Sequence, residues 1–443
     1  MLQNDTIAAI ATPSGEGALA IVRMSGPDAA AILARVFEGH KMPLPSHTLC
    51  YGKIPNIDEV MCTCMYAPRS YTREDVVEIY CHGGSSTIMA VLAELFRNGA
   101  RPAEPGEFTK RAFLNGRIDL SQAEAVMELI NAKTDLARRA VLRKLSGGLS
   151  SKINIFRDKI LTWLAHIELS VDYPEHEEEA MNLSLVKQGS QALIKDLQAL
   201  QATAQFGQRI KTGVPTVIVG KPNVGKSSLM NAILQEERAI VTNIPGTTRD
   251  TLTEQIIVRN IPILLTDTAG IREGADQVEQ IGINRTKEHA QAAELILHVL
   301  DQSSSLTEED LVIAELNKEQ KKIFVFNKSD LGRLDANVHH AFTPSVEISA
   351  KTGEGLDELY QVVEEMFLGG EIFADGDIIT QARHVYLLDS AIERLKAVVS
   401  SDMPEDIIAI DLKAAYVLLG EIIGEAVGDD VLDRIFEEFC LGK

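Results

Sequence analysis

A phosphate-binding loop constrains this chain more than any other feature. Residues 220–227 read GKPNVGKS, which satisfies the pattern G-x-x-x-x-G-K-[ST] in full. The apolar run 214–219 before the loop predicts a buried strand, and the residues after it predict the start of a helix. Backbone N–H groups around Gly225 are expected to wrap phosphates at the helix N-terminus, with Lys226 adding positive charge. The Ser227 hydroxyl is expected to ligate Mg²⁺, so the motif predicts a nucleotide-binding α/β domain.

Three further motifs follow in the order expected of a guanine-nucleotide-binding domain. Residues 246–250 read GTTRD and offer a switch threonine, and residues 267–270 read DTAG, which suits an Mg²⁺-linked aspartate and a glycine near the γ-phosphate. Residues 327–330 read NKSD, and the carboxylate of Asp330 can accept hydrogen bonds from both N–H groups on the N1/N2 edge of guanine. Adenine lacks these donors, so the motif predicts GTP; residues 349–351 (SAK) complete the base pocket.

Length and composition set wider limits. A chain of 443 residues predicts two or three domains. It has neither an apolar run of about 18 residues nor a secretory signal, so we expect a soluble protein that is not exported. Its five cysteines are an odd number without metal-ligand spacing, and Cys62 and Cys64 are expected to pack within a strand. A reducing cytoplasm fits this cysteine usage.

The net charge of −21 argues against a broad nucleic-acid-binding surface. A chain with this charge repels a phosphate backbone over most of its surface, so any such contact is expected to be local or shared with a partner. The basic helical cluster comprises Arg138, Arg139, Arg143 and Lys144. It fits a solvated helix face or a local nucleic-acid contact.

The pattern along the chain predicts a multidomain α/β and α protein. Residues 1–117 mix short strand patterns with Gly/Pro turns, and residues 118–209 are helical in pattern. The nucleotide-binding domain extends over 210–370, and residues 371–443 are helical again. Each helical stretch alone would leave an apolar face uncovered. The nucleotide-binding domain is therefore expected to be inserted into one discontinuous helical domain.

The predicted active site lacks the glutamine that orients water in Ras-like GTPases, because Ile271 occupies that position. Glu279 is a candidate for orienting water through a bridging water, or it is an ordinary exposed glutamate. The transition state also needs a cation. Arg249 or Arg272 could supply it, as could a monovalent cation held by Asn223 and nearby backbone carbonyls.

Several long sequence blocks resemble the MnmE (TrmE) family of tRNA modification GTPases over essentially the full length. The blocks that carry the resemblance are residues 5–7 (DTI), 11–13 (ATP), 21–26 (IVRMSG), 78–84 (EIYCHGG), 105–116 (PGEFTKRAFLNG) and 439–443 (FCLGK). The resemblance implies an N-terminal α/β tetrahydrofolate-binding domain that dimerises, a discontinuous all-helical domain, and an inserted Ras-like P-loop G domain. It also implies K⁺-dependent pairing of the G domains, which stimulates GTP hydrolysis.

The resemblance further implies a reaction on tRNA in the cytoplasm. A FAD-dependent partner, MnmG (GidA), joins the homodimer to add a carboxymethylaminomethyl-type group at C5 of the wobble uridine. A 5-formyl- or 5,10-methylene-tetrahydrofolate would supply the one-carbon unit, and glycine or ammonium the amine. The alternative is a ribosome-assembly GTPase, which acts as an RNA-binding switch and has no covalent chemistry of its own. An assembly factor is expected to carry an RNA-binding appendage or a basic tail, whereas this chain ends acidic.

Residue roles follow from the motifs and the resemblance together. The residues expected to hold GTP are Asn223, Val224, Gly225, Lys226, Ser227, Ser228, Thr242, Thr247, Thr248, Asp267, Gly270, Asn327, Lys328, Asp330, Ser349, Ala350 and Lys351. The metal ligands implied are Ser227 and Thr248 for Mg²⁺, and Asn223, Thr242, Ile244 and Thr247 for K⁺. The folate contacts implied are Arg23, Glu78, Arg117 and Lys443.

The resemblance gives catalytic roles to Glu279 and Cys440. Glu279 falls on the family's water-orienting glutamate, and Cys440 on its functionally required cysteine. A structural cysteine is the alternative for Cys440, and a prenylation box fits poorly because the chain ends Gly-Lys. Its position next to the chain's end makes burial in a core unexpected.

Overall fold

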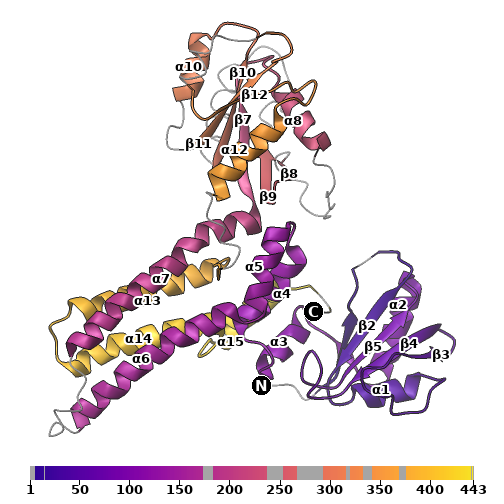
Figure 1. Cartoon of the computed structure of the whole chain (residues 1–443). Coiled ribbons are helices and arrows are strands. Elements are labelled where there is room, and N and C mark those ends of the chain that lie inside the picture. The colour runs from indigo at the N-terminus through magenta and orange to yellow at the C-terminus, as the bar shows by residue number, and fades with distance from the viewer. Residues whose placement is uncertain are drawn as a thin grey trace. The chain divides into compact units, whose positions relative to one another are not determined.

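The computed structural model describes residues 5–13, 15–172, 183–236, 253–266, 293–315, 320–332, 342–368, 376–440 and 442. The chain divides into two compact units. Unit 1 comprises Met1–Ile130, Lys144–Ile194 and Leu387–Lys443, and unit 2 comprises Asn131–Arg143 and Lys195–Tyr386. Each unit contains one six-stranded sheet (Figure 1). Among the described residues, no helix is both long and apolar enough to cross a membrane.

The sheet of unit 1 is built from the N-terminal part of the chain. Its strands are β1 (Ile7–Ile10), β2 (Ala20–Ser25), β3 (Cys50–Ile54), β4 (Asp58–Met65), β5 (Val76–Cys81) and β6 (Arg101–Pro102). They lie in the order β3-β4-β5-β2-β1-β6, and every neighbouring pair is antiparallel except β1 and β6. Arg23 on β2 lies directly opposite Glu78 on β5 in this register.

Two helices cover one face of this sheet. Both α1 (Ala29–Val36) and α2 (Ser85–Arg97) place apolar side chains in a core with the inward residues of the strands. The predicted strand packing of Cys62 and Cys64 is confirmed, because both thiols are free and buried in β4. The alternation along β2 and β5 turns Arg23 and Glu78 away from this core. The polar face of the sheet is therefore the one available for a site.

Helices from both ends of the chain form the rest of unit 1. They are α3 (Glu107–Leu114), α4 (Leu120–Asn131), α6 (Gly148–Asp172), the first part of α7 (Leu183–Thr212), most of α13 (Ala382–Ser400), α14 (Glu405–Ile423) and α15 (Asp429–Glu437). Arg157 of α6 lies with its guanidinium 4.2 Å from the ring centroid of Tyr416 on α14. Leu120 and Ala123 of α4 share a core cluster with Phe436 of α15. The two helical stretches cover each other's apolar faces, as the sequence predicts.

The sheet of unit 2 has the strand–loop–helix context that the phosphate-binding motif requires. Its strands are β7 (Val214–Val219), β8 (Thr253–Val258), β9 (Ile261–Thr266), β10 (Leu295–Asp301), β11 (Lys321–Asn327) and β12 (Ser345–Glu347). The order is β12-β11-β10-β7-β9-β8, with only β8 antiparallel to its neighbour. Helices α8 (Lys226–Glu236) and α12 (Leu356–Leu368) pack on one face, and α10 (Glu308–Glu315) packs on the other.

Two local features of the helical stretch depend on the fold. The stretch breaks at residues 132–134, after α4, and α5 (Asp135–Leu145) begins there. The Thr134 hydroxyl accepts a hydrogen bond from the backbone N–H of Ala137, which caps the new helix. Lys144 is buried instead of solvated, because its ammonium lies between the carboxylates of Glu124 and Glu128.

The other members of the basic cluster have acidic partners as well. Arg138 and Arg139 are exposed and pair with Asp135 on their own helix, whereas Arg143 pairs with Asp377. The cluster is therefore largely neutralised within the protein. This result favours the solvated-face interpretation for Arg138 and Arg139 over a nucleic-acid contact.

Candidate functional site

The motifs of unit 2 meet at one edge of its sheet. The phosphate-binding loop follows β7, the NKSD motif begins at the last residue of β11, and the SAK motif follows β12. These strands and β10 are parallel, so their carboxyl ends lie side by side. Ligands of open α/β sheets bind in the crevice beyond these ends. The fold therefore brings together motifs that are more than a hundred residues apart in the sequence.

The phosphate-binding loop has backbone angles and close contacts that require glycine. Gly220 has a φ of +147° and Gly225 a φ of +99°. A Cβ on Gly220 would lie 2.4 Å from the carbonyl oxygen of Val299, and one on Gly225 would lie 2.2 Å from Nδ2 of Asn327. The Lys226 ammonium donates to the carbonyls of Gly220 and Lys221 at 2.8 and 2.7 Å, so it lies within the loop. This cradle fits a polyphosphate at the N-terminus of α8.

Asn327 ties the base-recognition motifs to the loop. Its side-chain amide donates to the Val224 carbonyl at 2.9 Å, and its side-chain oxygen accepts from the Ala350 N–H at 3.0 Å. The residue is 2% exposed, so these bonds are shielded from water. One side chain thereby links the phosphate loop, the NKSD motif and the SAK motif.

The next residues of the NKSD motif extend this connection. Lys328 donates to the backbone carbonyl of Asn223 at 2.9 Å and to the carboxylate of Asp301 at 2.5 Å. Burial raises the pKa of Asp301, but hydrogen bonds from Lys328 and Ser303 outweigh burial and hold that pKa below its usual range. The Ser349 hydroxyl donates to Asp330 at 2.9 Å, which orients the carboxylate of an exposed residue.

The predicted GTP residues thus fall into two groups. Those of the phosphate loop and the two base motifs are brought together, with Ser227 and Ser228 in the first turn of α8 and Lys351 exposed beside the SAK loop. The other predicted nucleotide, metal and catalytic residues of this site lie outside the described residues: Thr242, Ile244, Thr247, Thr248, Arg249, Asp267, Gly270, Arg272 and Glu279. Among the residues that the structure does describe, no group of three or more His, Cys, Asp or Glu side chains could hold a metal ion.

A second polar site lies on the open face of the sheet in unit 1. Arg23 pairs with Glu78 at 2.7 Å, and the other carboxylate oxygen of Glu78 accepts from the Tyr80 hydroxyl at 2.8 Å. Burial and the acceptor Glu78 raise the pKa of Tyr80 to about 12. The guanidinium of Arg23 also lies 5.8 Å from the ring centroid of Phe108 on α3. The site therefore presents a paired arginine and carboxylate beside an aromatic wall.

The C-terminal tail reaches this site. Arg23 donates to the carbonyl of Gly442 at 3.3 Å, a contact between residues 419 positions apart. Gly442 has a φ of +86°, and a Cβ there would lie 1.9 Å from the carbonyl oxygen of Ile10, so this position requires glycine. Cys440 is exposed, as expected, and its carbonyl accepts from the Gly106 N–H at 3.4 Å. Lys443 lies outside the described residues.

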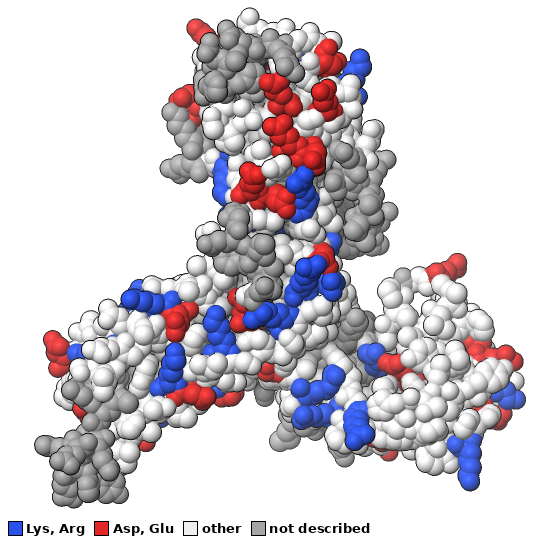
Figure 2. All heavy atoms as spheres, in the orientation of Figure 1, with Lys and Arg blue, Asp and Glu red and all other residues white. Residues whose placement is uncertain are grey.

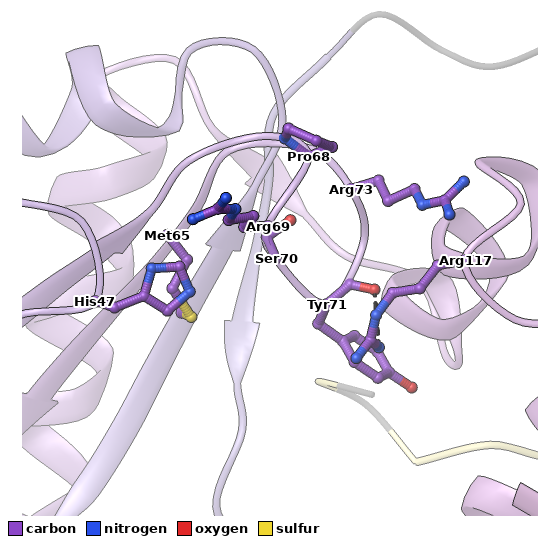
Figure 3. A pocket seen from close by; sticks show the side chains of 8 residues that line it. All are labelled: His47, Met65, Pro68, Arg69, Ser70, Tyr71, Arg73 and Arg117. Carbon is purple, nitrogen blue, oxygen red and sulfur yellow. Dashed lines mark hydrogen bonds between the residues drawn. The ribbon is translucent and has the colours of Figure 1, made fainter. Parts of the chain in front are cut away.

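Tyr71 connects the Arg23 site with Arg117. The guanidinium of Arg117 lies 4.9 Å from the Tyr71 ring centroid and donates to the Tyr71 carbonyl at 3.2 Å (Figure 3). Burial raises the pKa of Tyr71, and the hydrogen bond with Thr109 and the charges of Arg117 and Arg23 oppose that rise. Both predicted folate arginines therefore act on the same phenol.

The sequence interpretation missed Tyr71 and the loop residues around it. His47, Arg69 and Arg73 line the same pocket as Tyr71 and Arg117. They lie in loops, so no periodic pattern connects them, and only the fold brings them to one place.

Comparisons with known proteins agree with these features. The family model described as MnmE helical domain matches residues 120–440, and the one described as GTP-binding protein TrmE N-terminus matches residues 6–117. The chain belongs to the MnmE (TrmE) family of tRNA modification GTPases. Family membership confirms the predicted fold class, with its α/β N-terminal part, helical domain and inserted P-loop domain.

Relatives in the MnmE family match along the whole chain. The tRNA modification GTPase MnmE of Bacillus licheniformis is 46% identical over 459 residues, which cover 99% of this chain and 100% of the relative. That of Listeria welshimeri is 47% identical over 457 residues, covering 100% of both chains. That of Enterococcus faecalis is 46% identical over 460 residues, covering 100% of this chain and 99% of the relative.

Two solved structures share a shorter similarity. An Era variant of Aquifex aeolicus bound to GDP and aluminium fluoride is 27% identical and covers 43% of this chain and 69% of its own, with a TM-score of 0.28. The G domain of the T. maritima FeoB iron transporter is 27% identical and covers 34% of this chain and 97% of its own, with a TM-score of 0.27.

The MnmE family, as a family of GTPases, implies GTP and Mg²⁺. The described residues fit the nucleotide, since the loop glycines leave no room for a side chain and Lys226 already lies among loop carbonyls. Acidic side chains gather on the face of unit 2 that carries α12 (Figure 2). This face does not offer the basic surface that a tRNA backbone would need.

Proposed function

We propose that this MnmE-family chain hydrolyses GTP to GDP and phosphate, and that hydrolysis drives modification of tRNA. In the proposed reaction a carboxymethylaminomethyl-type group is added to C5 of the wobble uridine, together with the FAD-dependent partner MnmG. The observation that carries the GTPase part is the junction made by Asn327 between the phosphate loop and the base motifs. Family membership supports the tRNA part.

The phosphate loop and the base motifs bind different parts of the nucleotide. The backbone N–H groups from Gly225 onward and the Lys226 ammonium hold the phosphates, and Ser227 with Thr248 holds Mg²⁺, which neutralises phosphate charge when bound. Asp330 accepts the two guanine N–H groups, and Ser349 orients that carboxylate.

Hydrolysis needs a residue that orients water and a cation for the developing charge. We assign the water-orienting role to Glu279. A K⁺ held by Asn223, Thr242, Ile244 and Thr247 would supply charge next to the phosphates when bound, with Arg249 and Arg272 as further cations. The left-handed φ of Asn223, +66°, turns the loop at this residue. In this proposal K⁺ stimulates hydrolysis by supporting the pairing of two G domains. Hydrolysis therefore depends on the homodimer.

The open face of the unit 1 sheet is the proposed folate site. Glu78 can accept the N–H groups of an aminopyrimidine ring, and Arg23, which pairs with Glu78 at 2.7 Å, can contact the same end of the ligand. Arg117 and Lys443 can pair with the ligand's acidic end. The folate supplies the one-carbon unit when bound. Cys440 lies exposed two residues before the Gly442 that contacts Arg23, and we assign it a role in modification.

The proposed domains are residues 1–117 for folate binding and dimerisation, 118–209 and 371–443 for the helical domain, and 210–370 for the G domain. The cytoplasm is the proposed compartment, because tRNA and its modifying enzymes are found there.

Nucleoside analysis of tRNA tests the proposal. A strain lacking this protein should lose the C5-modified wobble uridine, and the intact gene should restore it. The Lys226→Ala variant should not restore it, whereas Lys195→Ala, which removes an exposed lysine of α7, should. Normal wobble uridine in the deletion strain, with altered ribosomal subunits, would instead support a ribosome-assembly GTPase.

A further inference from the structure

A pocket of about 590 Å³ next to the proposed folate site is lined by a group of basic side chains. Its lining residues are His47, Met65, Pro68, Arg69, Ser70, Tyr71, Arg73 and Arg117. The volume lies within the range of roughly 300–1,000 Å³ that small-molecule sites occupy. In Figure 3, His47, Met65 and Arg69 lie at one end of the pocket, and Tyr71, Arg73 and Arg117 lie at the other. The basic groups are therefore spread along the pocket.

The arginines of this pocket differ from most others in the same domain. Arg23, Arg97, Arg101 and Arg111 all pair with carboxylates. Within the described part of the chain, no carboxylate lies within ion-pair distance of Arg69, Arg73 or Arg117. The nearby carboxylates have other partners, since Glu74 pairs with Arg111 and Asp75 accepts from the Ala67 N–H. The pocket thus carries positive charge that the protein itself does not neutralise.

The loop that carries Arg69 and Arg73 is held in place from both sides. The Thr72 hydroxyl, fully buried, lies 2.6 Å from the Ser25 hydroxyl, and the Asn115 amide donates to the Thr72 carbonyl at 2.7 Å. Arg73 also donates to the Asn115 carbonyl at 2.9 Å. The loop backbone and the Arg73 side chain are therefore positioned before any ligand arrives, which lowers the entropy cost of binding.

Two lining residues adopt a backbone conformation that side chains disfavour. His47 and Arg73 each have a φ of +59°. Non-glycine residues in the left-handed region persist where the surrounding structure holds them, and they concentrate at ligand sites. Here the bonds of the Thr72 loop supply that restraint for Arg73.

We infer that this pocket binds the γ-linked glutamate chain of a polyglutamylated folate. The inference rests on the proposed folate site, which meets the pocket at Tyr71, where the charges of Arg23 and Arg117 both act. A glutamate chain repeats a carboxylate on a short apolar linker. Guanidinium groups bind carboxylates in a planar, bidentate way, and the Met65, Pro68 and Tyr71 surfaces suit the linkers.

An RNA strand fits this pocket less well. Nucleic acids are bound by basic surface that follows the phosphate backbone over many residues, whereas these basic groups gather at one open pocket of the surface. The net charge of −21 also disfavours a polyanion that extends beyond the pocket.

Binding of two folates to the full chain tests the inference. The probes are 5-formyl-tetrahydrofolate with one and with five glutamates, and the readout is the ratio of their dissociation constants by calorimetry. Exposed ion pairs are individually weak, so we expect the pentaglutamate to bind about 10-fold more tightly. In the double variant Arg69→Gln, Arg73→Gln the ratio should fall to about 1. Equal binding of both folates by the wild type would overturn the inference.

Arg35→Gln is the matched control. Like Arg73, Arg35 is exposed and donates to the backbone carbonyl of an asparagine, Asn98, at 2.7 Å. This variant should keep the wild-type ratio. Thermal unfolding midpoints identify a misfolded double variant, in which case Arg69→Gln alone should lower the ratio.

Two other outcomes decide against the inference in different ways. If the double variant keeps the folate ratio but weakens binding of unmodified tRNA in filter assays, the pocket contacts RNA and the inference is wrong. If neither folate binds the wild type, the folate part of the proposed function fails, and the inference fails with it. Equal binding of the two folates leaves the folate site standing, so the two failures can be distinguished.

Discussion

The side-chain amide of Asn327 donates a hydrogen bond to the backbone carbonyl of Val224 at 2.9 Å, across 103 positions of sequence. The same side chain accepts from the Ala350 N–H, so the base motifs support the phosphate loop from behind. Gly225 is adjacent, and even a Cβ there would lie 2.2 Å from the Asn327 amide. Binding of the base and binding of the phosphates are thus coupled through one buried side chain.

Asn327→Ala should therefore impair more than base binding. It leaves the Val224 carbonyl and the Ala350 N–H without their partner, which costs about 1–3 kcal/mol of unfolding free energy for each buried group. Affinity for both GTP and inorganic triphosphate should fall, because the loop loses its support. Fluorescent-nucleotide titration and thermal unfolding measure these effects. Gln361→Ala, which removes an exposed amide of α12, should change neither. Unchanged triphosphate binding in Asn327→Ala would argue against the coupling.

Asp330→Asn should change the base preference of the site from guanine to xanthine. The carboxylate accepts two guanine N–H groups, and its loss should weaken GTP binding about 10²-fold or more, since hydrogen bonds to a charged group are worth about 1.5–3 kcal/mol each. An amide can instead donate to the C2 carbonyl of xanthine. The ratio of dissociation constants for XTP and GTP measures the change. Equal weakening for both nucleotides would mean that Asp330 does not read the base edge.

A carboxylate–arginine cluster in unit 1 should make stability depend on pH. Asp5 and Glu107 accept hydrogen bonds from Arg101 and Arg111. Burial raises the pKa of each carboxyl, but the arginines outweigh burial and hold both pKa values below the usual range. A depressed pKa in the folded state stabilises the fold above the unfolded value of about 4, and this stabilisation is lost as the pH falls through the folded pKa.

Glu107→Gln should flatten this pH dependence. Hydrogen exchange of β1 and α3 amides, corrected for intrinsic rates, should show weaker protection than the wild type at pH 7 and a smaller loss between pH 5 and pH 3. The Lys53 and Glu38 pair is exposed on both sides, so Glu38→Gln serves as the control and should behave as the wild type. An identical pH profile for Glu107→Gln would show that the cluster does not set the dependence.

Local motifs predicted the strand–loop–helix context of residues 220–227, because these residues are contiguous and impose that context themselves. The support from Asn327 was not predictable, because it depends on how β11 lies relative to the loop after β7. The same holds for the contact of Arg23 with Gly442, which joins the two ends of the chain. Helix patterns predicted that the two helical stretches, to which α6 and α14 belong, cover each other, since their apolar faces required a partner. They did not predict which helices meet.

The sequence pattern could not predict the burial of Lys144 either. The sequence places this lysine on a basic helix next to arginines that are exposed. Its burial depends on Glu124 and Glu128, which α4 brings near. A charge that is neutralised by tertiary contacts looks the same in sequence as one that is solvated.

Cys440 should be the only thiol of the native protein that reacts rapidly. The other four cysteines are buried. Burial raises the pKa values of Cys62 and Cys81, and it raises the pKa of Cys64 to about 11. Thiolates are the reactive form, so these groups react slowly. Titration with an aromatic disulfide reagent should give one fast equivalent, absent in Cys440→Ser, and five after unfolding. A second fast thiol in the native protein would contradict the burial of the sheet cysteines.

Gly442→Ala should release the C-terminal tail from β1. A Cβ at this position would lie 1.9 Å from the Ile10 carbonyl oxygen, and the φ of +86° disfavours any side chain, so the tail cannot keep its place. Arg23 then loses its bond to the Gly442 carbonyl, and the tail residues should become susceptible to carboxypeptidase. Gly428→Ala is the matched control, because no atom lies within 4 Å of a Cβ there and its φ is −68°. The control should resist digestion as the wild type does. If Gly442→Ala is equally resistant, contacts other than the packing of Gly442 against Ile10 of β1 hold the tail.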